Sequence, residues 1–268
     1  SVMSETPMIE KVRELAVIAG KEIASIYRGN VWTVTSKADE SPITQADLRA
    51  NELIVAGLKK FSNDPIVSEE GDVLLKAPSS RFWLVDPLDG TRDFVNRMDT
   101  FVVCIALIEN GEPILGVIYA PISEELYSAE KGKGAIGPEG KLIFNRNTRT
   151  ELAAAGSRST PSDRMKALYE QFGITSIERF GSALKFCKVA SGDFDVYPRF
   201  GPTKEWDTAA GQIIAEEAGC KVVDMSTGER LLYGKPNLDN RGFVCCRNDL
   251  DVAEQIYRFN VERLKNQP

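Results

Sequence analysis

Hydrophobic residues at helical spacing mark two helices at the start of the chain. Between Pro7 and Gly29, apolar residues recur every three or four positions, which predicts an amphipathic helix with Thr6 as its N-cap and Pro7 as its first residue. The same periodicity predicts a second helix over about residues 45–61, capped by Thr44. Two helices therefore precede the first clear strand.

Short apolar runs, typical of strands, follow these helices. They cover residues 66–68, 81–85, 101–108, 113–120 and 126–129. Asn110-Gly111 between two of the runs predicts a hairpin, and Pro87 is expected to end the ladder of the second run. The strands can form an antiparallel sheet against the two helices, with residues 131–140 as a loop or a turn between further strands.

The second half of the chain alternates between strands and helices. Strands are expected at 152–156, 194–197, 221–224 and 243–246, and helices at 162–172, 182–191, 206–218 and 249–265. This alternation is typical of an α/β unit. We therefore expect an α+β domain over residues 1–147 and an α/β domain over residues 148–268.

Composition indicates a globular protein. Of the 268 residues, 43% are apolar and 27% are charged, and the longest apolar run is far shorter than the ~18 residues that span a bilayer. A net charge of -6 without basic runs is unfavourable for nucleic-acid binding. The five cysteines lack C-x-x-C spacing and have apolar neighbours, which predicts buried, reduced thiols in a cytoplasmic protein.

The chain contains no histidine. This excludes a Ser-His-Asp triad and a zinc ion bound by histidine. Any chemistry must come from carboxylates, lysine, arginine, hydroxyls, thiols or a bound ion.

Acidic residues follow three apolar segments directly: Glu69-Glu70, Asp86 with Asp89, and Asp207. Taken singly, a solvated acidic pair, an Asx turn and a favourable acid at a helix start explain them. If they converge, each close pair of ionised groups repels by about 4 kcal/mol at ~4 Å, and divalent cations would relieve that repulsion. An all-oxygen set favours Mg²⁺ or Mn²⁺, and so suggests metal-assisted chemistry on a phosphate.

Three motifs carry a family resemblance. Glu69-Glu70, the Asp-Pro-Leu-Asp-Gly-Thr run that ends at Thr91 and the Trp-Asp-x-Ala-Ala-Gly run that ends at Gly211 resemble, in that order, the inositol monophosphatase superfamily. Its members are Mg²⁺-dependent, lithium-sensitive phosphatases, and the resemblance covers essentially the whole chain. It implies a layered α-β-α-β-α sandwich of the inositol monophosphatase and fructose-1,6-bisphosphatase type.

The resemblance also implies residue roles. Two or three Mg²⁺ ions, for which Mn²⁺ may substitute, would be held by Glu69, Asp86, the carbonyl of Leu88, Asp89 and Asp207. The amides of Gly90 and Thr91 match the phosphate cradle, as expected at a helix start. Thr91 and Asp47 match the pair that orients and deprotonates the metal-activated water. Three residues after Thr44, Asp47 also fits a capping box, so its role rests on the resemblance.

Two basic residues point to a substrate. The run from Gly181 to Cys187, with Ser182 and Lys185, and the run around Arg199 resemble the 3′(2′),5′-bisphosphate nucleotidases of the CysQ type. Inositol monophosphatases carry Asn and Glu at the two basic positions, whereas Lys185 and Arg199 are donors suited to a second phosphate.

The resemblance implies that adenosine 3′,5′-bisphosphate places its 3′-phosphate on the metals. Its 5′-phosphate would meet Ser182, Lys185 and Arg199, and residues 157–159 are expected to line the same pocket. The full set expected to bind substrate is Glu69, Leu88, Asp89, Gly90, Thr91, Ser182, Lys185, Arg199 and Asp207.

Three functions remain in competition at this point. The first is hydrolysis of this small-molecule nucleotide to AMP and phosphate, in sulfur metabolism. The second is an inositol monophosphatase or related sugar phosphatase, and the third is a non-catalytic binder of metal or nucleotide. The oligomeric state stays open between a monomer and a homodimer.

Overall fold

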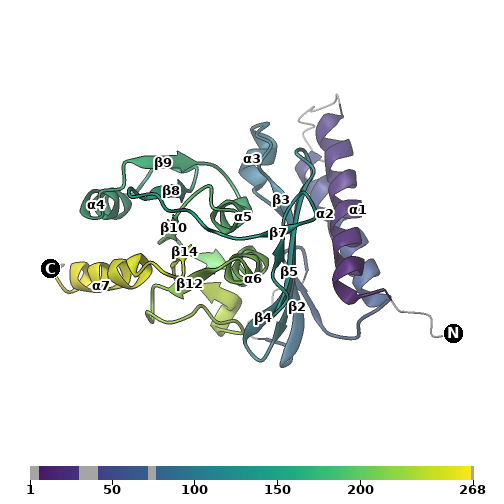
Figure 1. Cartoon of the computed structure of the whole chain (residues 1–268). Coiled ribbons are helices and arrows are strands. Elements are labelled where there is room, and N and C mark those ends of the chain that lie inside the picture. The colour runs from purple at the N-terminus through teal and green to yellow at the C-terminus, as the bar shows by residue number, and fades with distance from the viewer. Residues whose placement is uncertain (1–5, 30–41, 72–76, 267–268) are drawn as a thin grey trace.

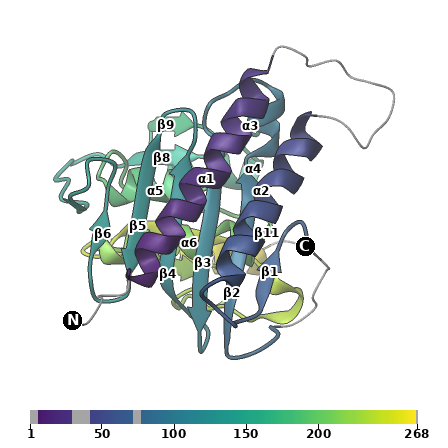
Figure 2. The same ribbon diagram turned by 90° about the vertical axis from the view of Figure 1, so that its right-hand side faces the viewer.

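Five alternating layers of helices and sheets make up the protein. The computed structural model describes residues 6–29, 42–71 and 77–266. Helices α1 (Met8–Arg28) and α2 (Pro42–Lys59) lie side by side on the outer face of a seven-stranded sheet (Figures 1 and 2). Helices α5 (Leu184–Ala190) and α6 (Ala209–Glu217) separate it from a five-stranded sheet, whose far face carries α4 (Asp163–Gln171) and α7 (Val252–Lys265) (Figure 1). The expected sandwich is confirmed.

The larger sheet keeps its strands in sequence order. These strands are β1 (Ile66–Ser68), β2 (Arg81–Asp89), β3 (Val102–Glu109), β4 (Glu112–Ala120), β5 (Glu125–Glu130), β6 (Ala135–Ile136) and β7 (Leu142–Ile143). Asn110 and Gly111, with φ of 50° and 82°, form the predicted two-residue hairpin between β3 and β4. The sheet is not wholly antiparallel as expected, because β1 runs parallel to β2.

The smaller sheet has the strand order β12-β14-β10-β8-β9. Its strands are β8 (Ala153–Gly156), β9 (Ser176–Arg179), β10 (Val196–Arg199), β12 (Cys220–Asp224) and β14 (Phe243–Arg247). The sequence did not predict β9, nor the pairing of β11 (Thr203–Lys204) with β13 (Asp239–Asn240). The strands of the seven-stranded sheet precede residue 147 in the sequence and those of the five-stranded sheet follow it. One core cluster contains residues of both sheets, so the division into two domains stays a prediction.

Alternating side chains of single strands enter different cores. On β2, Leu84 packs into the middle core with α5 and α6, while Val85 packs against α1 and α2. On β14, Cys245 belongs to the middle core and Cys246 to the outer core with α4 and α7. All five cysteines are buried and free, as predicted, while the cytoplasmic location stays a prediction.

Both N-terminal helices depart from their predicted starts. Helix α1 begins at Met8, and Pro7, with φ of -55° and ψ of 144°, is the capping residue in place of Thr6. Helix α2 begins at Pro42, so Thr44 lies within the first helical turn instead of capping it. Proline fits the first helical position because its missing N–H is not needed there.

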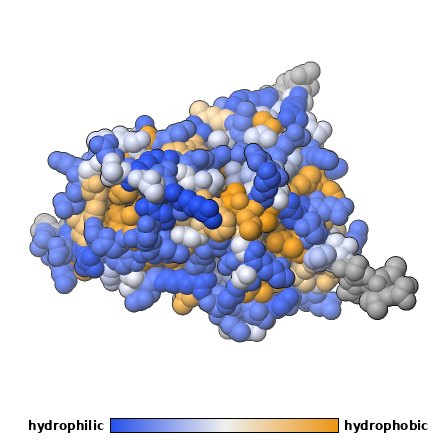
Figure 3. All heavy atoms as spheres, in the orientation of Figure 1, coloured by the Kyte–Doolittle hydropathy of each residue, from blue (hydrophilic) through white to orange (hydrophobic). Residues whose placement is uncertain are grey.

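The surface is mainly hydrophilic on the face drawn in Figure 3, with hydrophobic residues gathered between α4 and α7 and beside the larger sheet. Scattered exposed apolar residues such as Phe144 and Leu232 are ordinary for a folded protein. Among the described residues, no helix combines the length and apolar character needed to cross a membrane.

Candidate active site

A bulge in β2 brings Asp86 and Asp89 to one face of the larger sheet. Asp86 pairs with Cys104 and Asp89 with Val102, so three steps along β2 match two steps along β3. Both partners face the middle core. The expectation that Pro87 ends the strand is wrong, because the bulge accommodates it and β2 continues to Asp89.

Asp207 joins these two residues from the other half of the chain. It ends a short 3-10 helix, η2 (Glu205–Asp207), and Thr208 separates it from α6, so it does not lie inside that helix as predicted. Its carboxylate accepts the Lys204 amide at 2.9 Å. One carboxylate oxygen each of Asp86, Asp89 and Asp207 lies within 4.8 Å of the others, and we call these three residues the acidic cluster.

Burial and mutual repulsion raise the pKa values of the acidic cluster. Burial, reinforced by the charges of Asp89, Asp207 and Glu69, raises the pKa of Asp86 well above its ordinary value. Burial and the charge of Asp207 raise the pKa of Asp89 to about 7, and burial also raises the pKa of Asp207. None of the ion pairs among the described residues includes the cluster. Its all-oxygen donors therefore fit a hard cation.

Glu69, Glu70 and Asp47 extend this negative region. Glu69 lies just beyond β1, and its charge acts on both Asp86 and Asp47. Asp47 is 9% exposed, and burial, with the charges of Glu70 and Glu69, raises its pKa to about 8. In the described part of the chain its Oδ1 has no hydrogen-bond partner. The capping interpretation is wrong, because α2 begins at Pro42 and Thr44 is therefore not the N-cap that a capping box with Asp47 requires. Helix α2 contacts α3 (Thr91–Val95), but the pairing of Asp47 with Thr91 stays a prediction.

A cavity of about 310 Å³ opens beside the acidic cluster. It is lined from the first half by Asp89, Gly90 and Thr91, and from the second half by Ser182, Lys185 and Arg199. Gly90 has φ of 97°, and a Cβ there would approach the Cα of Phe101 to 3.2 Å, so this turn into α3 requires glycine. The structure thus brings the predicted phosphate cradle and the predicted second phosphate site together.

Lys185 is the most buried of these basic residues. It is 2% exposed, and its Nζ donates to the carbonyl of Phe180 at 2.7 Å and lies 5.2 Å from the ring centre of Tyr197. Burial, with the charge of Arg199, lowers its pKa to about 7 against the opposing charge of Asp89. A solvated surface lysine, the alternative for this position, is excluded.

Ser182 and Arg199 are held by neighbouring loops. Arg199 donates from Nη1 to Ser157 Oγ at 3.2 Å, which places part of the segment 157–159 at the cavity, as expected. Ser182, with φ of 73°, donates its hydroxyl to the carbonyl of Thr100. A non-glycine residue in this conformation is strained, which is common at functional sites.

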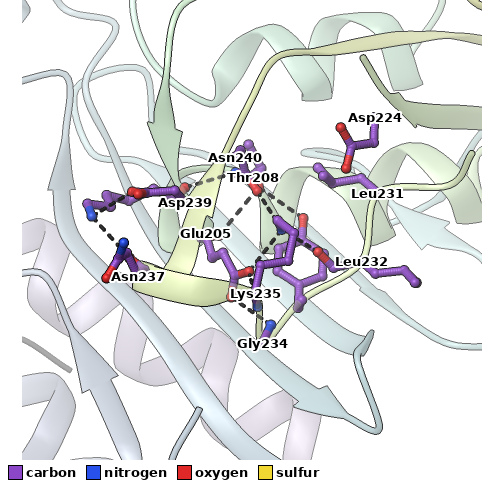
Figure 4. Close-up of polar contacts among 12 residues, drawn as sticks. Glu205, Thr208, Asp224, Leu231, Leu232, Gly234, Lys235, Asn237, Asp239 and Asn240 are labelled. Atoms are coloured by element: carbon purple, nitrogen blue, oxygen red, sulfur yellow. Dashed lines mark hydrogen bonds and ion pairs between the residues drawn. The ribbon is translucent and has the colours of Figure 1, made fainter. Parts of the chain in front are cut away.

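A buried polar network, which the sequence analysis missed, lies behind Asp207. Glu205 is fully buried and accepts the amides of Gly234 and Lys235 at 2.8 and 3.0 Å and the Lys235 ammonium at 2.9 Å. The ammonium also donates to Asn240, whose amide reaches Thr208 at 2.9 Å (Figure 4). We call these residues the Glu205 network. It fixes the turn that presents Asp207.

The geometry and the motifs define a member of a known phosphatase family. A sequence model described as the inositol monophosphatase family matches residues 4–257, and the chain belongs to this family. The acidic cluster agrees with a metal-dependent family, and the predicted resemblance is confirmed.

Particular relatives are named as bisphosphate nucleotidases. The 3′(2′),5′-bisphosphate nucleotidase CysQ of Shigella flexneri is 45% identical over 223 residues, covering 81% of this chain and 90% of that protein. A solved structure of CysQ from Bacteroides thetaiotaomicron matches with a TM-score of 0.81 and 36% identity, covering 90% of this chain and 97% of that one. The Thermotoga maritima inositol monophosphatase matches with a TM-score of 0.76 and 27% identity, over 95% and 98% of the two chains.

Proposed function

We propose that this protein is a Mg²⁺-dependent 3′(2′),5′-bisphosphate nucleotidase that removes the 3′-phosphate of adenosine 3′,5′-bisphosphate and leaves AMP. The relatives named CysQ support this activity. The observation that carries the substrate assignment is the cavity, whose lining combines Lys185 and Arg199 with Asp89 and Asp207 of the acidic cluster. A substrate with two phosphates can meet both sets of groups at once.

The acidic cluster, Glu69 and the carbonyl of Leu88 would hold two or three Mg²⁺ ions. Leu88 lies in the bulge, outside the regular ladder, and its side chain is fully buried. The raised pKa values of the cluster support this assignment, because a compensating positive charge would keep all three carboxylates ionised. When bound, such ions supply charge that polarises the phosphate and acidifies the attacking water.

The remaining residues bind the substrate and move a proton. The amides of Gly90 and Thr91, at the start of α3, would hold the 3′-phosphate. Asp47, whose Oδ1 is buried without a partner in the described structure, is suited to take the proton of the water, with Thr91 orienting it. Lys185 and Arg199 bind the 5′-phosphate, with Ser182 at the same end of the cavity.

Phosphate release from two substrates tests the proposal. Adenosine 3′,5′-bisphosphate and inositol 1-phosphate are compared side by side, with Mg²⁺ and with EDTA. We expect faster turnover of the bisphosphate and none with EDTA. Faster turnover of inositol 1-phosphate would assign an inositol phosphatase instead, and no turnover of either with Mg²⁺ would indicate a non-catalytic binder.

Arg199→Glu tests the role of the second phosphate. The substitution should impair turnover of the bisphosphate and spare that of inositol 1-phosphate, because only the bisphosphate has a group for Arg199 to bind. Arg258→Glu, the same charge change on the exposed side of α7, is the matched control. Equal activity of the Arg199 variant and the control on both substrates would contradict the substrate assignment.

A further inference from the structure

Asp93 connects the two sides of the active-site cavity. It lies on α3, four residues after Asp89, and is 2% exposed. Its Oδ1 accepts Nε of Arg158 at 2.8 Å, and its Oδ2 accepts the Thr100 hydroxyl at 2.8 Å. Arg158 also donates to the Thr100 hydroxyl at 3.2 Å. The ion pair therefore joins the phosphate-cradle segment to the loop after β8 in the second half of the chain.

The same loop holds one of the cations assigned to the second phosphate. Ser157, next to Arg158, accepts the hydrogen bond from Arg199. A chain of contacts thus runs from α3 through Arg158 and Ser157 to Arg199.

The segment that carries Lys185 is packed against the same carboxylate. A Cβ at Gly181 would lie 1.4 Å from Asp93 Oδ2, so the backbone of this segment lies directly on Asp93. The next two residues are tied to the first half as well: Ser182 donates to the Thr100 carbonyl, and the Ala183 amide donates to Asp89 at 2.6 Å. The positions of Lys185 and Arg199 relative to the phosphate cradle therefore depend on the contacts around Asp93.

We infer that Asp93 and Arg158 form a positioning pair that sets the distance between the two phosphate subsites, and so selects substrates with two phosphates over those with one. This inference rests on the proposed function. The carboxylate of Asp93 contacts both the Arg158 loop and the Gly181 backbone. Asp93 itself lies on the short helix α3, in the same segment as the phosphate cradle, so it connects the cradle to both. Loosening the pair lets the two subsites shift, which penalises only a ligand that must reach both.

Asp93→Asn is tested against Asp195→Asn as its matched control. Asp195 is also a buried carboxylate paired with arginine: side-chain exposures are 3% and 34% for Asp93 and Arg158, and 1% and 35% for Asp195 and Arg149. Asp195 has a second, longer ion pair with Arg247 at 3.9 Å. Asp195 accepts the Ala153 amide and does not line the cavity. Both substitutions remove one buried charge from an ion pair, but only the first affects the subsites.

The measurement is kcat and KM with Mg²⁺ for adenosine 3′,5′-bisphosphate and for adenosine 3′-phosphate, which has the same ester but no 5′-phosphate. Asp93→Asn should raise KM for the bisphosphate about tenfold with little change in kcat, and leave adenosine 3′-phosphate within about threefold. Asp195→Asn should leave kcat and KM for both substrates unchanged. Arg158→Met removes the other, more exposed partner of the pair and should give the same result. It serves as the second variant in case Asp93→Asn folds poorly.

The outcomes separate the two proposals. A wild-type protein without preference for the bisphosphate over adenosine 3′-phosphate overturns the proposed function and this inference with it. A wild-type preference that both Asp93→Asn and Arg158→Met retain overturns this inference alone, as does an equal loss on both substrates.

Discussion

Glu205 and Asp207 are two residues apart in the same turn, yet the surroundings of their carboxylates are opposite. Glu205 accepts two backbone amides and the Lys235 ammonium. Asp207 accepts one backbone amide and faces two other carboxylates. The Glu205 network is complete within the chain, whereas none of the ion pairs in the described structure includes a residue of the acidic cluster.

This difference separates carboxylates that support the fold from carboxylates that bind a ligand. A buried charge is tolerated when its own chain supplies donors, and is costly when it does not. The Glu205 network holds the turn still, and the acidic cluster presents charge to the cavity. Substitutions in the two regions are therefore expected to have opposite effects on stability.

Asp89→Asn should have the largest effect on activity. Losing one ligand of the proposed metal site should lower kcat/KM for the bisphosphate by about 1000-fold, because the remaining groups cannot hold the ions in place. In EDTA the same variant should melt at a higher temperature than the wild type, because one repelling charge is gone. Phosphate release and thermal melting measure the two effects. Retained activity, or a lower melting temperature in EDTA, would count against the acidic cluster as the metal site.

Glu205→Ala should have the largest effect on stability. Removing this carboxylate leaves the amides of Gly234 and Lys235 and the Lys235 ammonium without their acceptor, which should lower the free energy of unfolding by about 3 kcal/mol. Urea unfolding in EDTA measures it, with Asp89→Asn as the comparison of opposite sign. A Glu205→Ala protein as stable as the wild type would remove the distinction between the two regions.

Stability in EDTA should fall as the pH rises from about 4 to 8. The pKa values of Asp47 and Asp89 are raised to about 8 and about 7 in the folded protein, so in this window the folded state binds more protons than the unfolded chain. At about 1.4 kcal/mol per pKa unit, the raised values of the two groups amount to a loss of several kcal/mol, complete above the higher value. Saturating Mg²⁺ should suppress it. Urea unfolding at several pH values tests this, and a rise in stability across the window would contradict it.

Arg49→Ala should have the smallest effect. Arg49 is 60% exposed at its side chain and pairs with Glu22 at 3.1 Å on the outer helices. Solvent screens such a pair, so the free energy of unfolding should change by about 0.5 kcal/mol or less. Urea unfolding at the same pH measures this change. A decrease in the free energy of unfolding as large as that of Glu205→Ala would contradict the view that ion pairs stabilise this protein mainly where the carboxylate is buried.

The sequence predicted the acidic cluster, but not the buried contacts that hold the surrounding segments in place. Asp86, Asp89 and Asp207 each follow an apolar element, which indicates where a strand or loop delivers a carboxylate, and the motifs then brought them together. The partners of Glu205 could not be predicted, because Lys235 lies 30 positions away in a loop without a motif. Arg158 was expected at the pocket, but its pairing with Asp93, 65 positions away, was not predicted. Such contacts depend on tertiary packing.

Among the secondary structure elements, the predictions succeeded where the periodicity was strong. The two N-terminal helices and the hairpin at Asn110 were recovered. Strand β9 was missed because its residues are mostly exposed and show no apolar alternation, and β11 with β13 because each contains only two residues. Pro87 misled the prediction, since a bulge tolerates proline where a regular ladder does not.

The bulge at Pro87 and Leu88 makes the length of the Asp-Pro-Leu-Asp segment as important as its composition. In an unbroken strand, residues three positions apart point to opposite faces, and here the one extra residue cancels that phase difference. A regular ladder of the same length would keep both aspartates in the sequence but turn Asp89 toward α1 and α2. Deleting Pro87 or Leu88 would instead keep the two aspartates on one face and remove the bulge that sets the Leu88 carbonyl apart from the ladder. Among homologous chains, this segment should therefore keep two residues between its aspartates while their side chains vary.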